Sequence, residues 1–194
     1  GRAITLVNVP AEVWDVLSGF RFDAVWLMGV WERSPAGRAM AMENDDLRQA
    51  FAAALPDADD EDIVGSPYSI RAYEVDEALG GRDGLAAARA ELAARGMGLI
   101  LDFVPNHVAP DHPWIVEHPD YFIRGTAADL ASAPTEFFET GGRIVANGRD
   151  PYYPPWPDVA QLNAFDAGLR AATTDLLLDI AGQCDGLRCD MAML

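Results

Sequence analysis

The sequence predicts an α/β fold built on a parallel β-sheet. Three apolar runs, at 24–30, 98–104 and 185–191, have the length of β-strands. The first two are almost entirely apolar, which is typical of parallel strands covered on both faces, whereas the third is more polar. Helical segments alternate with these runs, and that alternation indicates βα units whose strands are parallel.

Four segments are predicted to be helices: 10–19, 43–56, 82–96 and 166–182. Their ends carry start and stop signals, such as Pro10 near a first turn and Gly96 at a carboxyl end. The longest segment repeats its leucines at the spacing of one helical face. The residues from Ser34 to Met42 are expected to form a short loop.

Composition and charge exclude several classes of partner. The 194 residues are half hydrophobic, which is enough for one substantial core and too apolar for disorder. There are 31 acidic and 14 basic residues, giving a formal net charge of −17. A field of that sign repels phosphate backbones and anionic lipids, so neither nucleic acid nor a membrane is expected as a partner. A neutral substrate is favoured.

The two cysteines bear on the compartment. Cys184 and Cys189 are five residues apart, which places them on opposite faces of a strand, so we expect no disulfide between them. The lack of a stabilising disulfide favours a reducing compartment, and the cytoplasm is the expected location. No stretch approaches the ~18–20 apolar residues that cross a bilayer, and residues 1–14 lack a signal-peptide layout.

The segment 105–165 differs from the rest of the chain. It has little periodicity, and it holds a proline cluster at 150–158 together with two tryptophans and three tyrosines. A connection of this length usually has a function or forms a small subdomain. It follows the carboxyl end of a predicted strand, where α/β enzymes build their active sites.

Charged residues within two of the predicted strands are the candidates for chemistry. Asp102 lies in a nearly apolar run, where a carboxylate is costly unless it is paired or used. Arg188 and Asp190 share one face of the third run, and Arg188 is placed to pair with both carboxylates if the strands are neighbours. A carboxylate kept ionised by an arginine is suited to attack a sugar carbon, and His107 is placed to donate to a substrate hydroxyl.

Four motifs resemble those of the α-amylase superfamily, glycoside hydrolase family 13. They are DFVPNH at 102–107, GLRCD at 186–190, GSPYSIRAYEVDEALGG at 65–81 and WPDVAQLNAF at 156–165, and they occur in the family's order. The resemblance implies part of a (β/α)8 TIM barrel, from about its first helix to its fourth strand. It divides the chain into a first barrel part (1–104), an inserted subdomain after the third barrel strand (105–165) and the continued barrel (166–194).

The resemblance also implies residue roles. Asp190 matches the nucleophile that forms a covalent glycosyl-enzyme, and Arg188 matches the arginine that orients it. His107 and Asp102 match the pair that supports the cleaved sugar, and Tyr68 matches the tyrosine on which that sugar stacks. The expected substrates are neutral oligosaccharides or α-glucans, cleaved or transferred with retention.

The resemblance implies no required cofactor, but Asn106 matches a residue that braces the loop and ligates calcium in calcium-binding members. Ser69 and Ala72 depart from the family, which usually has aspartate at the first position and often at the second. The family's general acid/base glutamate and second aspartate would both follow Leu194. We therefore expect these 194 residues to be inactive alone and to require the remainder of the barrel from the same full-length chain.

Two alternatives remain open from the residues. A metal-dependent barrel hydrolase is one, because all three histidines fall close together with carboxylates between them. Its candidate ligands are His107, His112, His118, Asp102, Asp111 and Asp120. A non-catalytic sugar-binding module is the other, because the aromatic side chains of 105–165 could form a stacking surface. Those side chains are Trp114, Trp156, Tyr152 and Tyr153.

Overall fold

The computed structural model describes residues 4–192, which form an α/β structure of two compact units. Unit 1 comprises the residues up to Glu32, Tyr73–Phe103 and Ala171–Asp190. Unit 2 comprises Arg33–Ala72, Val104–Arg170 and the residues after Asp190. Each unit is therefore assembled from segments that are distant in the sequence.

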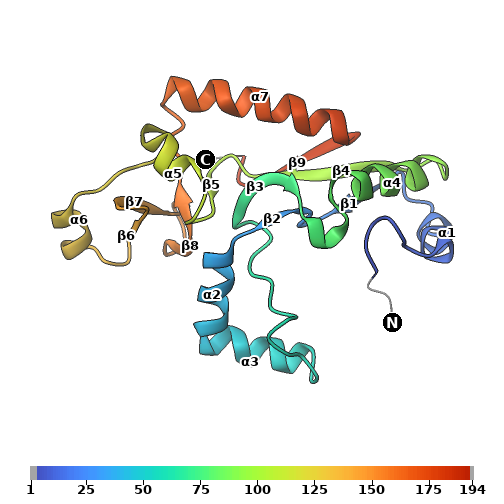
Figure 1. Ribbon diagram of the computed structural model, residues 1–194, viewed down its shortest axis with the longest axis horizontal. Helices are drawn as coiled ribbons and strands as arrows, with labels where there is room; N and C mark the ends of the chain where they lie inside the picture. Colours follow the sequence, from blue (N-terminus) through green and yellow to red (C-terminus); the bar gives the residue numbers. More distant parts are fainter. Residues whose placement is uncertain (1–3, 193–194) are drawn as a thin grey trace. The chain divides into compact units, whose positions relative to one another are not determined.

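Unit 1 is built on a three-stranded parallel sheet in the order β1-β4-β9 (Figure 1). Its strands are β1 (Ala24–Leu27), β4 (Gly98–Phe103) and β9 (Gly186–Cys189). Ala24 is the Cα partner of Gly98, and Ile100 is the partner of Gly186. These are the three apolar runs of the sequence, so the predicted strands and their parallel pairing are confirmed.

Among the helices of unit 1, α4 (Gly81–Ala93) packs on this sheet with an apolar face. The others are α1 (Ala11–Gly19), the short 3-10 helix η1 (Glu77–Leu79) and most of α7 (Ala167–Gln183). In α4, Leu85, Ala88 and Leu92 recur at the spacing of one helical face and are fully buried, as are Leu99 and Leu101 of β4. The predicted helices 10–19, 82–96 and 166–182 are confirmed, with ends shifted by up to three residues.

Outside the segment 105–165, two strands and one α-helix were not predicted. Strands β2 (Trp31–Arg33) and β3 (Ile70–Val75) form a two-stranded sheet, and β2 is too short to show a period. Helix α2 (Pro35–Glu43) occupies the place of the expected loop from Ser34 to Met42, so that expectation was wrong. The hydroxyl of Ser34 accepts a 2.8 Å hydrogen bond from the Gly37 N–H, and Pro35 begins the helix, which are ordinary start signals.

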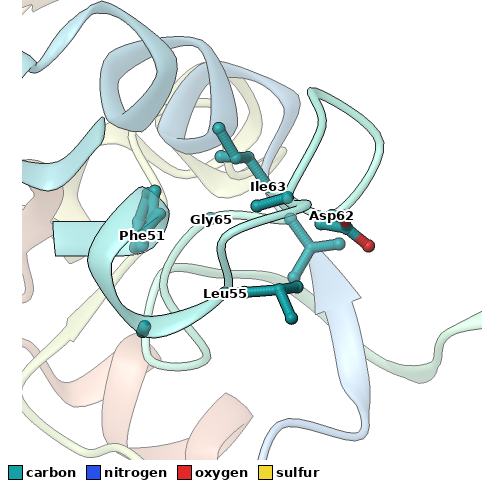
Figure 2. A pocket seen from close by; sticks show the side chains of 8 residues that line it. Phe51, Leu55, Asp62, Ile63 and Gly65 are labelled. Atoms are coloured by element: carbon teal, nitrogen blue, oxygen red, sulfur yellow. The ribbon is translucent and has the colours of Figure 1, made fainter. Parts of the chain in front are cut away.

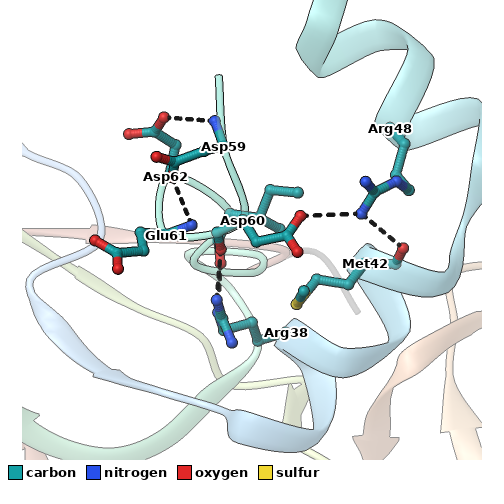
Figure 3. A network of polar contacts seen from close by, with 8 residues as sticks. Arg38, Met42, Arg48, Asp59, Asp60, Glu61 and Asp62 are labelled. Carbon is teal, nitrogen blue, oxygen red and sulfur yellow. Dashed lines mark hydrogen bonds and ion pairs between the residues drawn. The ribbon is translucent and has the colours of Figure 1, made fainter. Parts of the chain in front are cut away.

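Helix α3 (Asp45–Ala54) corresponds to the predicted helix 43–56 and begins at an asparagine cap. The Asn44 Oδ1 accepts from the Leu47 N–H at 3.0 Å. After α3 an acidic loop contacts both helices: Arg48 Nη1 of α3 lies 3.3 Å from Asp60 Oδ1, and Arg38 of α2 donates to the Asp60 carbonyl (Figure 3). An apolar pocket lies beside this loop, lined by Phe51, Ala54, Leu55, Ala58, Asp62, Ile63, Val64 and Gly65 (Figure 2).

The remainder of unit 2 contains a four-stranded sheet in the order β5-β8-β7-β6, whose paired strands are antiparallel. Its strands are β5 (His107–Val108), β6 (Phe137–Thr140), β7 (Arg143–Gly148) and β8 (Trp156–Gln161). The accompanying helices are α5 (Trp114–Glu117), the 3-10 helix η2 (Pro119–Tyr121) and α6 (Ala127–Ser132). Their core is one cluster of buried residues: Val108, Ile115, Phe122, Val145, Ala160, Leu162 and Leu169. Among residues 4–192 no helix has the length and apolarity that a membrane span needs.

Candidate active site

The end of the parallel sheet in unit 1 brings the two predicted carboxylates onto one arginine. Asp102 of β4 and Arg188 of β9 are Cα partners in the strand pairing. Arg188 Nη1 lies 2.9 Å from Asp102 Oδ1, and Arg188 Nη2 lies 2.8 Å from Asp190 Oδ1. The guanidinium thus bridges both carboxylates with charge-assisted hydrogen bonds, as the alternation of the two strands predicts.

Asp102 is buried, and its polar atoms are satisfied by neighbours in the same unit. Only 3% of its side chain is exposed. Its second oxygen, Oδ2, accepts a 2.9 Å hydrogen bond from the indole of Trp26, and its backbone carbonyl accepts one of 2.8 Å from the indole of Trp31. Each carboxylate oxygen therefore has a donor, which explains how a charge is tolerated within an apolar strand.

The side chain of Asp190 is more exposed to solvent than that of Asp102. Asp190 follows β9 directly, and its N–H donates to the Phe103 carbonyl at 2.8 Å. Its side chain remains 16% exposed, so one arginine orients a carboxylate that solvent reaches. The guanidinium carbon of Arg188 also lies 4.8 Å from the ring centre of Trp26, a cation–π contact that holds the arginine in place.

Asn106, His107 and Tyr68 lie in unit 2. His107 begins β5 and is 4% exposed, and burial lowers the pKa of its imidazole to about 4, so the ring is neutral at pH 7. Its Nδ1 lies 3.2 Å from Asn106 Nδ2, and its ring meets Trp156 edge-on at 5.4 Å between centroids. Tyr68 lies in the turn before β3 and is partly exposed.

One departure from the family pattern has a structural use of its own. Ser69 is 1% exposed, and its hydroxyl donates to the Asp158 carbonyl at 2.7 Å. Burial raises the pKa of the Asp158 carboxyl. Ser69 therefore fastens the turn that carries Tyr68 to the start of the β8 region, and a hydroxyl serves this purpose without a second buried charge.

The structure does not form the histidine cluster of the metal-hydrolase alternative. Within residues 4–192, no group of three or more His, Cys, Asp or Glu side chains is placed to hold a metal ion. His112 accepts a 3.1 Å hydrogen bond from the Trp114 N–H, and His118 stacks on Tyr121 at 4.7 Å between ring centroids. The Oδ1 of Asn106 accepts a 2.7 Å hydrogen bond from Gln161.

Acid sensitivity is expected from the buried histidines. Burial lowers the pKa of His112 to about 4, so the unfolded chain binds more protons than the folded one between about pH 6.5 and pH 4. The free energy of unfolding therefore falls as the pH falls through this range. His112→Asn keeps an acceptor for the Trp114 N–H and should remove about 2 kcal/mol of the loss between pH 7 and pH 5.

Urea unfolding at the two pH values measures this difference. His118→Asn is the matched control, because it makes the same chemical change at an exposed side chain. If the free energy of unfolding falls between pH 7 and pH 5 by the same amount in His112→Asn and in the unsubstituted protein, then His112 does not cause the acid sensitivity.

Several residues of the site escaped the sequence analysis. Trp26 was read only as a strand residue and Trp31 was given no role, although they supply two of the donors to Asp102. Trp26 could have been found, because it lies in a predicted strand that neighbours the strand of Asp102, and an indole N–H is a donor that a buried carboxylate needs. Gln161 was quoted only as part of a motif, and nothing local marks it as a partner of Asn106. Cys184 and Cys189 are both free, as predicted.

Known proteins resemble this chain in sequence and in fold. No family model matches the chain. An α-1,4-glucan:maltose-1-phosphate maltosyltransferase from Rhodospirillum rubrum is 34% identical over 128 residues, which are 63% of this chain and 16% of that protein. The chain thus spans about a sixth of the length of this curated relative.

Solved structures extend the similarity to almost the whole chain. An α-amylase from Lactobacillus plantarum matches 98% of it with a TM-score of 0.62 and 22% identity, covering 37% of the amylase chain. A maltogenic α-amylase from Thermotoga neapolitana also matches 98%, with a TM-score of 0.63 and 21% identity, covering 38% of that chain. These likenesses show the fold. Together with the relative found by sequence, they confirm the resemblance of this chain to the α-amylase superfamily.

Proposed function

We propose that this chain carries the nucleophile of a retaining α-glycoside hydrolase or transglycosylase that acts on α-glucans. The observation that carries the proposal is the bridge from Arg188 to Asp102 and Asp190 at the end of a parallel sheet. The related sequences and folds belong to enzymes of the α-amylase type, which supports a glycoside hydrolase or transglycosylase. The neutral substrate agrees with the net charge of −17.

In the proposed reaction, one oxygen of Asp190 bonds to the anomeric carbon as the glycosidic carbon–oxygen bond breaks. The leaving oxygen takes a proton from a general acid, and the product is a glycosyl ester of Asp190. Water or a sugar hydroxyl then attacks the same carbon and releases Asp190. Arg188 fixes the carboxylate for attack, and the buried Asp102 keeps Arg188 in position.

We propose His107 and Tyr68 as substrate contacts. A neutral His107 offers an N–H to a sugar hydroxyl, and Tyr68 offers an aromatic face to the ring. We propose that 105–165 is a subdomain inserted between the barrel parts 1–104 and 166–194. Retaining chemistry needs a second carboxyl group about 5–5.5 Å from the first. We place that group in a part of the protein outside these 194 residues, which alone should be inactive.

The stereochemistry of the product tests the proposal. The complete protein is mixed with maltooligosaccharides, and proton NMR follows the anomers of hydrolysed or transferred products as they form. Retention predicts that the α-anomer appears first, and the 194-residue chain under the same conditions should release nothing. Initial release of the β-anomer, or no reaction with any α-glucan, would overturn the proposal.

A sugar-binding role without turnover is a second candidate, because two neighbouring aromatic side chains are exposed. Tyr152 is 85% and Tyr153 is 69% exposed. Calorimetry of the complete protein with maltooligosaccharides, together with the assay above, separates the roles. Binding that is lost in Tyr152→Ala, in a protein that forms no product, would favour this candidate.

A further inference from the structure

Asn106 has an orientation that its hydrogen-bond partners determine. Its Nδ2 lies 3.1 Å from the Arg149 carbonyl, which only accepts hydrogen bonds. Its Oδ1 lies 2.7 Å from Gln161 Nε2, which only donates. Gln161 is oriented in turn, because the Arg149 N–H donates to its Oε1 at 3.0 Å and its Nε2 donates to the Asn106 carbonyl at 3.0 Å. Neither amide can be reversed without losing these bonds.

This orientation decides which nitrogen of His107 carries the proton. Asn106 Nδ2 lies 3.2 Å from His107 Nδ1 and has a second hydrogen to donate there. An Nδ1 that accepts a hydrogen bond presents its lone pair, so the proton of the neutral ring is on Nε2. Gly148 allows the close packing of this ring, because a side-chain carbon at 148 would lie 2.6 Å from Val159 Cγ2 and 3.1 Å from His107 Cβ.

We propose that Gln161 and Asn106 are positioning residues that hold His107 as the Nε2–H tautomer, so that it donates a hydrogen bond to a hydroxyl of the bound sugar. The proposal rests on the proposed function, which supplies the sugar. The hydrogen bonds run from the Arg149 backbone to Gln161, from Gln161 to Asn106 and from Asn106 to His107. All four residues lie in unit 2. Neither amide needs to touch the substrate.

Gln161→Glu tests this relay with a change of almost no volume. The Arg149 N–H can still donate to one oxygen of the new carboxylate, but the other oxygen now faces Asn106 Oδ1. Two acceptors repel, so the Asn106 amide is expected to rotate, give up its bond to the Arg149 carbonyl, donate to that carboxylate and turn its own oxygen toward His107 Nδ1. His107 must then carry a proton on Nδ1. Asn106→Asp should give the same result directly, because a carboxylate cannot donate to Nδ1.

Nitrogen-15 NMR of the complete protein, labelled at its histidine ring nitrogens, shows which nitrogen of His107 carries the proton. This measurement does not depend on activity. His107 should show a lone pair on Nδ1 and a proton on Nε2, and Nδ1 should become protonated in Gln161→Glu and Asn106→Asp. Gln49→Glu, the same chemical change on exposed α3, is the matched control and should change nothing. A proton on Nδ1 in the unsubstituted protein, or an unchanged tautomer in both site variants, would overturn the inference.

Kinetics separate this inference from the proposed function. Gln161→Glu should lower kcat on maltooligosaccharides about tenfold or more, since one hydrogen bond to the sugar is lost, whereas Gln49→Glu should leave kcat unchanged. A protonated Nδ1 together with an unchanged kcat would refute the positioning role and leave the proposed function intact. No turnover by the unsubstituted protein would refute the proposed function, while the NMR result would still show whether the amides set the tautomer.

Discussion

Asp190→Asn in the complete protein is expected to lower kcat on maltooligosaccharides by about a thousandfold or more. An amide oxygen can still accept the hydrogen bond that Arg188 donates at 2.8 Å, so the fold should persist. The amide is neutral and a poor nucleophile, however, and it cannot form the glycosyl ester. Initial rates with a reducing-sugar assay measure the loss.

Asp185→Asn is the matched control for this variant. Asp185 lies at the other end of β9, where its Oδ2 accepts a 2.9 Å hydrogen bond from the Leu99 N–H and its Oδ1 pairs with Arg89. An asparagine retains an acceptor there, so the rate should change by no more than a few-fold. Similar losses in both variants would indicate a general effect of substitution on the strand rather than a nucleophile at Asp190.

Asp102→Asn is expected to destabilise the protein by about 1–3 kcal/mol, the usual cost of leaving a buried polar group without its partner, because the Arg188 side chain is 38% exposed and keeps Asp190. Both carboxylate oxygens accept hydrogen bonds, from Arg188 and from the Trp26 indole. An amide has one oxygen, so its NH2 group would face one of these donors, and Arg188 would lose its buried counter-charge. Urea denaturation followed by tryptophan fluorescence measures the change in the free energy of unfolding.

Arg48→Ala provides the comparison. Arg48 pairs with Asp60 at 3.3 Å, but their side chains are 47% and 63% exposed, and an exposed ion pair contributes about 0–1 kcal/mol. We therefore expect a small change there and a large one at Asp102. A loss below about 1 kcal/mol at Asp102 would mean that the Asp102–Arg188 pair contributes no more than a surface pair.

The sequence was informative where the chain forms the parallel sheet. Nearly continuous apolar runs predicted β1 and β4, and the alternation in the third run predicted that Arg188 and Asp190 share a face. Two-residue periodicity and burial act within a few neighbouring residues, so they can be read locally. The bridge from Arg188 to both carboxylates follows once the two strands are taken as neighbours.

The sequence was uninformative where pairing or capping depends on distant partners. Strands β5 and β8 are antiparallel neighbours, although β5 has two residues and β8 contains Pro157. Such strands form because their backbone groups hydrogen-bond to another strand, and that strand lies far away along the chain. The helix at 35–43 was missed for a different reason, since the start signal at Ser34 was present and was not used.

The partners of the site residues illustrate the same limit. The indole of Trp26 reaches Asp102 across 76 positions, and the amide of Gln161 reaches Asn106 across 55. Hydrogen bonds of this kind have no periodic signature, because they depend on the three-dimensional approach of two chain segments. The residue types and motif order pointed to Asp102, Arg188 and Asp190, whereas the groups that hold them in position required the structure.

The most direct measurement traps the glycosyl-enzyme on Asp190. The complete protein is incubated with 5-fluoro-α-glucosyl fluoride, whose fluoride leaves without protonation and whose ring fluorine slows release of the sugar. Mass spectrometry of the digested protein should then find one added fluoroglucosyl group on the peptide that contains Asp190, and none in Asp190→Asn. A label on another carboxylate, or turnover with retention and no label on Asp190, would contradict the account.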